Sequence, residues 1–417
     1  MRLGARQPGR DIRLAPFCRV SAVQILSNRG GGLCYRGPNT ENDLILCEFG
    51  PWGEPVRFDA ARALVIAQRA DEVLPALARL EEARRAGAWI AGAIAYEAGF
   101  AFEPRLSPLV PQLDQPLLAF GIFDAPPEAA QLPPPGPAVL EPIRPLISER
   151  DYQAAFARAQ DYIAAGDCYQ INLTFPLETR LVQGTPLELY GALAARQPVG
   201  FGAYVDLGAG PVIVSRSPEL FVRLDAGGAI ETRPMKGTAP RDPDPLRDAE
   251  LARALARSEK DRAENLMIVD LLRNDIARIS TVGSVRVPEL FAVDSFATVH
   301  QMSSRVVGQL ARPASLPDLM QALFPCGSIT GAPKIRAMQI IHEVEPFARG
   351  IYCGSIGWMA PDGSASFSVA IRTLAIWADG RVRLNVGGGV VQDSTAAGEW
   401  EEALWKARYV QDLTTPA

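Results

Sequence analysis

The stretch Glu231-Thr-Arg-Pro-Met-Lys-Gly-Thr-Ala-Pro-Arg241 is the most informative part of the sequence. It places Lys236 between a stiff proline two residues earlier and a permissive glycine directly after it, so the backbone around the lysine is conformationally defined. A lysine held in this way becomes a nucleophile if burial lowers its pKa. The alternative is a surface turn with an ordinary solvated lysine, and this stretch alone leaves both interpretations open.

Further motifs occur on both sides of this stretch. They are Gly166-Asp-Cys-Tyr-Gln-Ile-Asn-Leu-Thr174, Ser215-Arg-Ser-Pro-Glu219, Glu264-Asn-Leu-Met-Ile-Val-Asp-Leu-Leu-Arg-Asn-Asp275, Gly327-Ser-Ile-Thr-Gly-Ala-Pro-Lys334, Gly350-Ile-Tyr-Cys-Gly354, Ala370-Ile-Arg372, Gly387-Gly-Gly389 and Gly398-Glu-Trp-Glu-Glu-Ala-Leu-Trp-Lys-Ala-Arg408. Together with Pro234-Met-Lys-Gly-Thr238, this ordered series resembles the family of chorismate-utilising enzymes, and within it the component I chains of aminodeoxychorismate synthases. The series is far more specific than any one of its motifs.

The resemblance implies an α+β fold, in which large antiparallel β-sheets pack as a sandwich with helices on the outside. Alternating apolar residues in 381–386 and 212–224 are compatible with such strands. The many prolines of 125–145 cannot lie in a helix or a central strand. We therefore divide the chain into an N-terminal region that resembles anthranilate synthase component I (1–124), a Pro-rich linker (125–145) and a chorismate-binding catalytic region (146–413).

In the N-terminal region we expect strands at 43–49 and 89–96 and a helix over 73–86. The run Tyr96-Glu-Ala-Gly99 resembles a segment of the same family. Its glycine suits close packing, and we interpret the run as part of the core rather than as a functional site. The N-terminal region should join the same sandwich, which makes the Pro-rich linker a surface excursion.

The composition excludes several classes of protein. A net charge of −5 without a basic stripe argues against a nucleic-acid partner. Neither a signal sequence nor an apolar run long enough to span a bilayer occurs, so we expect no membrane association. The six cysteines are scattered through apolar stretches without a Cys-x-x-Cys pair, which favours reduced thiols and a cytoplasmic location over a disulfide framework.

Two predicted helices carry candidate metal ligands. In the helix expected over 258–278, apolar residues follow Glu264 at spacings of three, four, seven and eight, so its carboxylate lies on the apolar stripe and must be paired, protonated or metal-bound. A salt bridge is the alternative. In the C-terminal helix, Glu399, Glu402 and Lys406 share one face, which could also be a solvated face. The resemblance implies that Glu264 and Glu402 hold a Mg²⁺ ion that binds the ring carboxylate of chorismate, with Glu399 close by, and carboxylate oxygens suit this ion.

The glycine-rich segments predict the substrate pocket. The amides of Gly387, Gly388 and Gly389 can close around an anion. The Gly327–Lys334 segment lacks the spacing of a phosphate loop, and Pro333 is instead expected to be a first helical residue, so that loop amides face a polar ligand.

The resemblance assigns further pocket residues. It implies that Thr330 lies against the chorismate ring and that Arg372, Tyr352 and Lys406 bind the enolpyruvyl carboxylate, for which a guanidinium is well shaped. His300 occupies the family's active-site histidine position, and we predict that it lies near the departing oxygen. A lone histidine is otherwise often structural.

Two positions favour one reaction among those of the family. Relatives that use water carry a base-acting lysine where this chain has Gln170, and glutamine cannot act as a general base, so ammonia is the expected nucleophile. Anthranilate synthases read alanine where this chain has Lys236. The implied mechanism is attack of Lys236 on C2, protonation of the departing C4 hydroxyl by Glu219, and addition of ammonia at C4 with release of the lysine. The product would be 4-amino-4-deoxychorismate, a precursor for para-aminobenzoate and folate; anthranilate synthase component I is the alternative.

The source of ammonia is expected to be a second protein. A Cys-His-Glu glutaminase needs a Gly-x-Cys-x-Gly elbow and a His-x-Glu, and neither occurs in the sequence. We therefore expect a glutamine amidotransferase subunit as partner. A non-catalytic module that only binds an aromatic precursor is the other class considered; the filled acid, nucleophile and metal positions argue against it.

Overall fold

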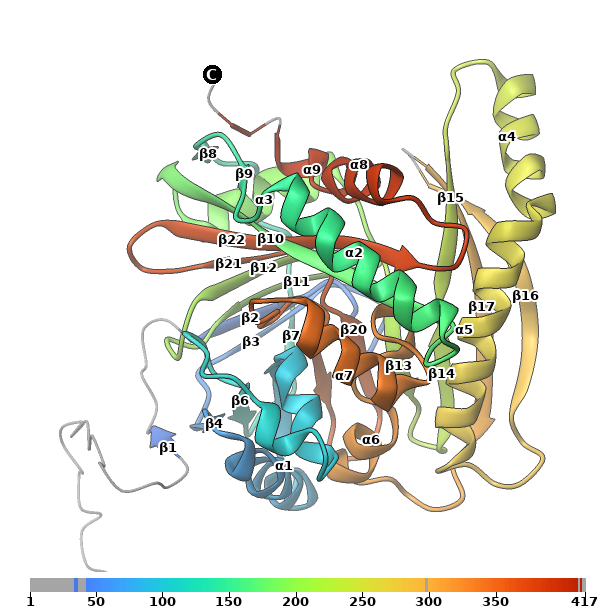
Figure 1. Cartoon of the computed structure of the whole chain (residues 1–417). Coiled ribbons are helices and arrows are strands. Elements are labelled where there is room, and N and C mark those ends of the chain that lie inside the picture. Colours follow the sequence, from blue (N-terminus) through green and yellow to red (C-terminus); the bar gives the residue numbers. More distant parts are fainter. Residues whose placement is uncertain (1–33, 37–42, 297–298, 412, 415–417) are drawn as a thin grey trace, which may run out of the picture. The chain divides into compact units, whose positions relative to one another are not determined.

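The computed structural model describes residues 34–36, 43–296, 299–411 and 413–414, which form two large antiparallel sheets (Figure 1). The first sheet has the order β1(Cys34–Arg36), β4(Ala63–Ala67), β6(Leu118–Phe123), β5(Trp89–Ile94), β19(Ser355–Met359), β20(Ala365–Val369), β13(Leu220–Leu224), β14(Ala229–Arg233), β17(Val299–Gln309) and β15(Met235–Pro240), with β16(Arg286–Ser295) also paired to β17. The second has the order β18(Gly331–Ala332), β10(Gln170–Gln183), β22(Arg381–Val390), β21(Thr373–Ile376), β12(Val212–Ser217), β11(Phe201–Asp206), β2(Leu44–Cys47), β3(Val56–Asp59) and β7(Glu128–Ala129), with β8(Val139–Leu140) and β9(Arg144–Pro145) paired to β10.

A core of apolar side chains lies between the sheets. Ile45 and Ala203 of the second sheet and Ile356 and Trp358 of the first belong to one buried cluster, and the indole nitrogen of Trp358 donates a hydrogen bond of 2.9 Å to the carbonyl of Phe49. Burial of these aliphatic and aromatic surfaces is the main force that holds the sheets together. The predicted sandwich is therefore present.

The described residues include α-helices, several of which begin at a side chain that caps them. They are α1(Ala70–Arg85), α2(Glu149–Ala164), α3(Pro186–Arg196), α4(Pro245–Arg257), α5(Glu259–Ala277), α6(Leu316–Leu323), α7(Lys334–Val344), α8(Ala396–Lys406) and α9(Arg408–Gln411). Ser258 caps α5 and Thr395 caps α8 through their hydroxyl groups. Helices α2 and α8 lie along β10 and β22 (Figure 1). The helices expected over 73–86 and 258–278 correspond to α1 and α5, whereas Pro333 is the N-cap of α7 rather than its first residue.

The N-terminal strands join both sheets. Strand β5 pairs with β19 in the first sheet, and β2 pairs with β11 in the second. The Pro-rich segment 125–145 contributes only the two-residue strands β7, β8 and β9. The proposed boundaries 1–124, 125–145 and 146–413 remain a prediction, and much of the first forty residues lies outside the described ranges.

Two short connections carry the chain from one sheet to the other. Pro218 and Glu219 connect β12 of the second sheet to β13 of the first, and residues 370–372 connect β20 of the first to β21 of the second. These links lie together because β12 pairs with β21 and β13 pairs with β20. The crossover therefore places Glu219 and Arg372 side by side. The amide of Val369, at the end of β20, donates a hydrogen bond of 3.1 Å to the carbonyl of Glu219 and so ties the two connections together.

The state of the cysteines and the character of the helices match what the amino-acid composition led us to expect. Cys47, Cys168, Cys326 and Cys353 are free and buried, while Cys18 lies outside the described residues. Within the described ranges, none of the helices combines the length and apolar character needed to cross a bilayer.

Candidate active site

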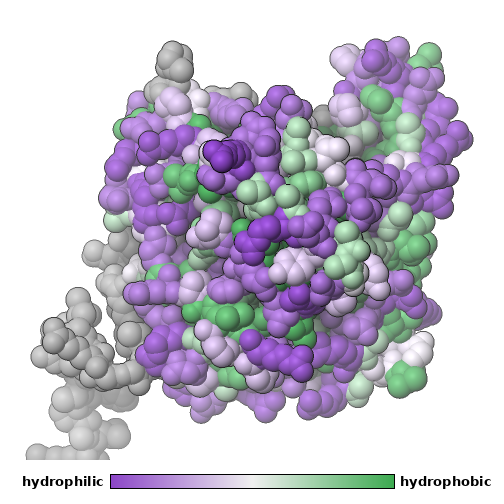
Figure 2. All heavy atoms as spheres, viewed as in Figure 1, coloured by the Kyte–Doolittle hydropathy of each residue, from purple (hydrophilic) through white to green (hydrophobic). Residues whose placement is uncertain are grey.

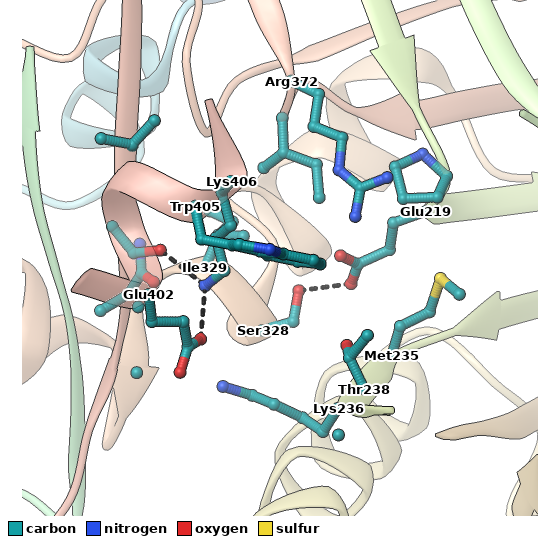
Figure 3. A pocket seen from close by; sticks show the side chains of 18 of the residues that line it. Glu219, Met235, Lys236, Thr238, Ser328, Ile329, Arg372, Glu402, Trp405 and Lys406 are labelled. Carbon is teal, nitrogen blue, oxygen red and sulfur yellow. Dashed lines mark hydrogen bonds and ion pairs between the residues drawn. The ribbon is translucent and has the colours of Figure 1, made fainter. Parts of the chain in front are cut away.

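A cavity of about 530 Å³ opens where the crossover links meet β15, α5, β22 and α8 (Figure 3). Its lining includes nearly all of the charged residues predicted from the sequence: Glu219, Lys236, Glu264, Arg372, Glu399, Glu402 and Lys406. Tyr352 and the three consecutive glycines of β22 line it as well. Residues more than 180 positions apart in the chain therefore form one site.

Glu219 lies buried at one side of the cavity with 4% of its surface exposed. Its Oε1 accepts a hydrogen bond of 2.7 Å from the hydroxyl of Ser328. Burial raises the pKa of Glu219 to about 7, even though this hydrogen bond and the charge of Lys236 act in the opposite direction. A carboxyl group with this pKa can hold a proton near neutral pH and release it during a reaction, as a general acid requires.

Lys236 extends into the same space from β15 (Figure 3). Burial lowers its pKa below the ordinary lysine value; Glu264 opposes this shift and Lys406 reinforces it. A Cβ atom on Gly389 would lie only 2.6 Å from Lys236 Nζ, so the amine occupies space that exists because position 389 is glycine. Lys236 therefore lies on a strand in the cavity and not in a surface turn, and its lowered pKa makes the nucleophilic, deprotonated amine more accessible than in an ordinary lysine.

Arg372 and Lys406 supply positive charge for an anionic substrate. Arg372 has φ of 51°, a left-handed conformation that non-glycine residues rarely adopt and that aims its guanidinium into the cavity (Figure 3). Burial lowers the pKa of Arg372. Lys406 Nζ donates to the carbonyl of Gly387 at 2.8 Å and forms an ion pair of 2.8 Å with Glu402.

The glycine triplet differs from the anion-binding loop that we expected. Residues 387–389 continue strand β22 and pair with Asn172, Leu173 and Thr174 of β10. A Cβ on Gly387 would lie 2.3 Å from the carbonyl oxygen of Leu173, and one on Gly388 would lie 2.6 Å from Glu399 Oε2. The glycines therefore make room for close backbone approach and for the charged side chains around them.

Three carboxylates on the cavity wall form an oxygen-only donor set. Burial raises the pKa values of Glu264 and Glu399, and in both cases the charge of Glu402 adds to the shift. Partial burial acts likewise on Glu402, but its ion pair with Lys406 outweighs this effect and lowers its pKa. As the side chains stand, no three acidic, histidine or cysteine groups in the described part of the chain are close enough to coordinate a metal. The carboxylate oxygens of the three glutamates and the repulsion between their charges nevertheless fit a divalent cation that prefers oxygen ligands, such as Mg²⁺.

Two predicted residues, Gln170 and Thr330, lie behind the cavity wall. Gln170 is fully buried, with neither amide atom hydrogen-bonded within the described structure, and its Nε2 would lie 3.1 Å from a Cβ on Gly389. Thr330 is buried too, but its hydroxyl donates to the carbonyls of Cys326 and Gly327 rather than facing the cavity. The placement of Thr330 against the substrate ring is therefore not supported.

His300 also lies outside the cavity lining. Its Nε2 is 2.9 Å from Asp248 Oδ1 and its Nδ1 is 2.8 Å from the hydroxyl of Ser295. Side chains alternate along β17, and the neighbouring Gln301 lines the cavity in its place, with Nε2 donating to the carbonyl of Gly237 at 2.8 Å. We therefore do not retain His300 as a group near the departing oxygen.

Several residues that line the cavity were not predicted from the sequence. Trp405 and Tyr409 follow Glu402 at spacings of three and seven, so the helical period could have indicated them. Ser328 belongs to a recognised motif, but its hydrogen bond to Glu219 required the crossover to be known. Asn172 lines the cavity from β10.

The described site is that of an enzyme acting on a small anionic molecule, since guanidinium, amine and carboxylate groups converge on one cavity. The chain belongs to the family of chorismate binding enzymes, whose model matches residues 48–412. Component 1 of the aminodeoxychorismate synthase of Klebsiella aerogenes is 46% identical over 267 residues, and anthranilate synthase component 1 of Streptomyces coelicolor is 43% identical over 262 residues.

These alignments cover 64% and 63% of this chain but only 58% and 51% of the two relatives. The chain thus spans little more than half the length of the curated relatives that it matches. The solved structure of anthranilate synthase component I from Streptococcus pneumoniae has a TM-score of 0.70 at 25% identity and covers 94% of each chain. The predicted family and fold class are confirmed.

Proposed function

We propose that the chain aminates chorismate at C4 with ammonia and forms 4-amino-4-deoxychorismate. The observation that carries this proposal is the placement of Lys236, whose amine projects into the cavity with a lowered pKa and forms no hydrogen bond or ion pair with the described residues. An amine with a lowered pKa loses its proton more readily, and its deprotonated form can attack carbon. The relatives named as aminodeoxychorismate synthases support the same assignment.

In the proposed reaction, Lys236 Nζ bonds to C2, the two conjugated ring double bonds shift, and the C4 hydroxyl leaves as water with the proton of Glu219. Ammonia then bonds to C4, both double bonds shift back, and the C2–nitrogen bond breaks to return Lys236. The proton lost by the new ammonium group restores Glu219. The sum is chorismate plus ammonia giving aminodeoxychorismate plus water, so atoms and charge balance.

In this proposal, residues of the chain hold the substrate throughout the reaction steps. Arg372 and Lys406 would bind the enolpyruvyl carboxylate, with Tyr352 beside them. Glu264, Glu399 and Glu402 would hold Mg²⁺, which when bound supplies positive charge for the ring carboxylate. The buried amide of Gln170, which has no hydrogen-bond partner within the described structure, lies behind the cavity wall near Gly389 and offers no base for activating water.

Ammonia in this proposal comes from a glutamine amidotransferase partner, as the designation "component 1" of the relatives suggests a second component. Product analysis tests the proposal. The purified chain, chorismate, Mg²⁺ and an ammonium salt should give 4-amino-4-deoxychorismate, and glutamine should replace ammonium only when the partner is added. Anthranilate as the main product would contradict amination at C4 and favour the reaction named for the Streptomyces relative.

A further inference from the structure

Arg349 joins two segments of the cavity wall from behind. It is 3% exposed, and its Nη1 donates to the carbonyl of Ile329 at 3.0 Å while its Nη2 donates to the carbonyl of Asn172 at 2.6 Å. Ile329 and Asn172 both line the cavity. One planar guanidinium group therefore fixes the separation of a loop and a strand that have no sequence proximity.

Glu345, at the C-terminal end of α7, holds this guanidinium in a two-point contact. Its oxygens accept from Arg349 Nε at 2.9 Å and from Nη2 at 2.7 Å, and Oε1 also accepts from the amide of Thr174 on β10. Both side chains are almost completely buried. The pair is therefore shielded from water, and its geometry is defined by hydrogen bonds on every side.

Glu97 of the N-terminal region supplies a second carboxylate. Its Oε1 accepts from the amide of Arg349 at 2.6 Å and its Oε2 from the amide of Gly350 at 3.1 Å. The preceding residue, Tyr96, donates its amide to the carbonyl of Gly350 at 2.8 Å, and its ring lies 4.6 Å from the Arg349 guanidinium. These contacts hold the start of the segment that carries Tyr352 into the cavity.

That segment has a strained backbone. Gly350 has φ of 62° and Cys353 has φ of 64°, so left-handed residues lie on both sides of Tyr352. A non-glycine residue in this conformation persists only where its surroundings impose it. The amide of Cys353 donates to the carbonyl of Ala370 at 2.9 Å, while the Glu97 carboxylate and the Tyr96 amide hold Gly350 at the other end of the segment.

We propose that Arg349 is a positioning residue for substrate binding, and that Glu97 and Glu345 hold it so that Asn172, Ile329 and Tyr352 are correctly spaced in the cavity. The Tyr96–Gly99 run, which we first interpreted as plain core, thereby gives the N-terminal region a part in substrate binding. The inference rests on the proposed function for its substrate, chorismate.

A purely stabilising role does not explain this network. A buried ion pair is often no more stabilising than an apolar replacement of similar size, because both charges lose their hydration. An apolar side chain could fill the volume of Arg349, but it could not bond two carbonyls from separate segments. Lysine keeps the charge but lacks the planar fork that reaches both.

Kinetics of Arg349→Lys and Glu97→Gln test the proposal, with Arg84→Lys as matched control. Arg84 is also buried, with 9% of its surface exposed, pairs with Glu81 at 2.8 Å and donates to the carbonyls of Ala360 and Pro361, but none of these residues lines the cavity. Because mispositioned binding groups weaken substrate binding more than the chemical step, we expect KM for chorismate to rise about tenfold in Arg349→Lys and roughly threefold to fivefold in Glu97→Gln, with kcat changed by less than about threefold. Arg84→Lys should leave KM within about twofold of the wild type.

Unchanged KM in both site variants, or an equal rise in Arg84→Lys, would overturn the proposal. If Arg349→Lys does not fold, Glu97→Gln decides alone, since it keeps the side-chain volume. Product identity is read in the same assay. A wild-type chain that makes anthranilate would contradict the proposed function and still leave the comparison of KM values for chorismate valid.

Discussion

The amine of Lys236 lies against the bare Cα of Gly389: a Cβ at that position would be 2.6 Å from Nζ. Strand β22 therefore shapes the space in which the lysine of β15 acts. The face of the molecule shown in Figure 2 is predominantly hydrophilic, with scattered apolar residues. The proposed role of Lys236 depends on the fit of its amine against Gly389 and not on the character of the molecular surface.

Substituting Gly389 by alanine should separate activity from stability. The three atoms nearest to the added methyl group belong to the ends of the Lys236 and Gln170 side chains, so the free energy of unfolding should change by less than about 1 kcal/mol. Displacement of the amine should lower kcat/KM at least about tenfold, because misplacing a reacting group by an ångström is costly. Steady-state kinetics and denaturant unfolding of the same preparation measure both quantities.

Gly200→Ala is the control, since a Cβ there meets nothing within 4 Å and Gly200 is not in the cavity lining. It should retain wild-type kinetics. Full activity in Gly389→Ala would show that the position of the Lys236 amine is unimportant.

The metal assignment predicts that Glu264→Gln and Glu402→Gln abolish turnover while unfolding stays cooperative. Each substitution removes one anionic oxygen ligand without opening a cavity, so metal affinity should fall and stability should change little. Activity should be titrated with Mg²⁺ for each variant.

The control is Glu401→Gln, because Glu401 lies on α8 beside Glu402 with an exposed side chain outside the cavity lining. Its activity should depend on Mg²⁺ concentration as that of the wild type does. Near-normal activity of either site variant across the Mg²⁺ series would exclude these carboxylates as the metal site.

Burial of Glu219 predicts a pH-dependent cost to stability. Its pKa rises from 4.5 to about 7 on folding, so the native state binds the proton more tightly and stability falls as pH increases between these values. The loss for one such group is about 3 kcal/mol at alkaline pH. Glu219→Gln, which cannot ionise, should therefore unfold at a higher temperature than the wild type at pH 8 and at a similar temperature at pH 4.5 to 5.

Glu97, whose pKa burial also raises to about 7, should leave a residual slope of the same sign in this variant. Thermal unfolding monitored by circular dichroism across this pH range measures the difference. An identical pH dependence in the wild type and Glu219→Gln would mean that Glu219 is ionised throughout the range.

Periodicity and motif order predicted much of the site. The helical spacing around Glu264 and the spacing of Glu399, Glu402 and Lys406 placed these groups on faces that the structure turns toward the cavity. Local spacing suffices there because each face belongs to one regular element. The β-sandwich was predicted from the resemblance to the enzyme family more than from the alternation of apolar residues along the strands.

The remaining features depend on tertiary contacts that local spacing does not contain. The orientation of His300 follows from strand alternation, in which Gln301 takes the cavity side, and from the partner Asp248 on α4. The role of Glu97 requires that the 349–354 segment lie beside it, 252 residues later in the chain. Thr330 bonds within its own loop, which the motif could not reveal.

The central claim is that Lys236 attacks the substrate and directs ammonia to C4, and mass spectrometry of its peptide tests this most directly. Wild-type chain incubated with chorismate and Mg²⁺, without ammonia, should show a substrate-derived adduct on the peptide containing Lys236, while Lys236→Ala should show none. The variant should also aminate far more slowly, with residual product shifted toward the C2 amine, because Glu219 and the ammonia site remain. An unmodified wild-type peptide, together with an alanine variant of undiminished rate and unchanged product, would contradict the account.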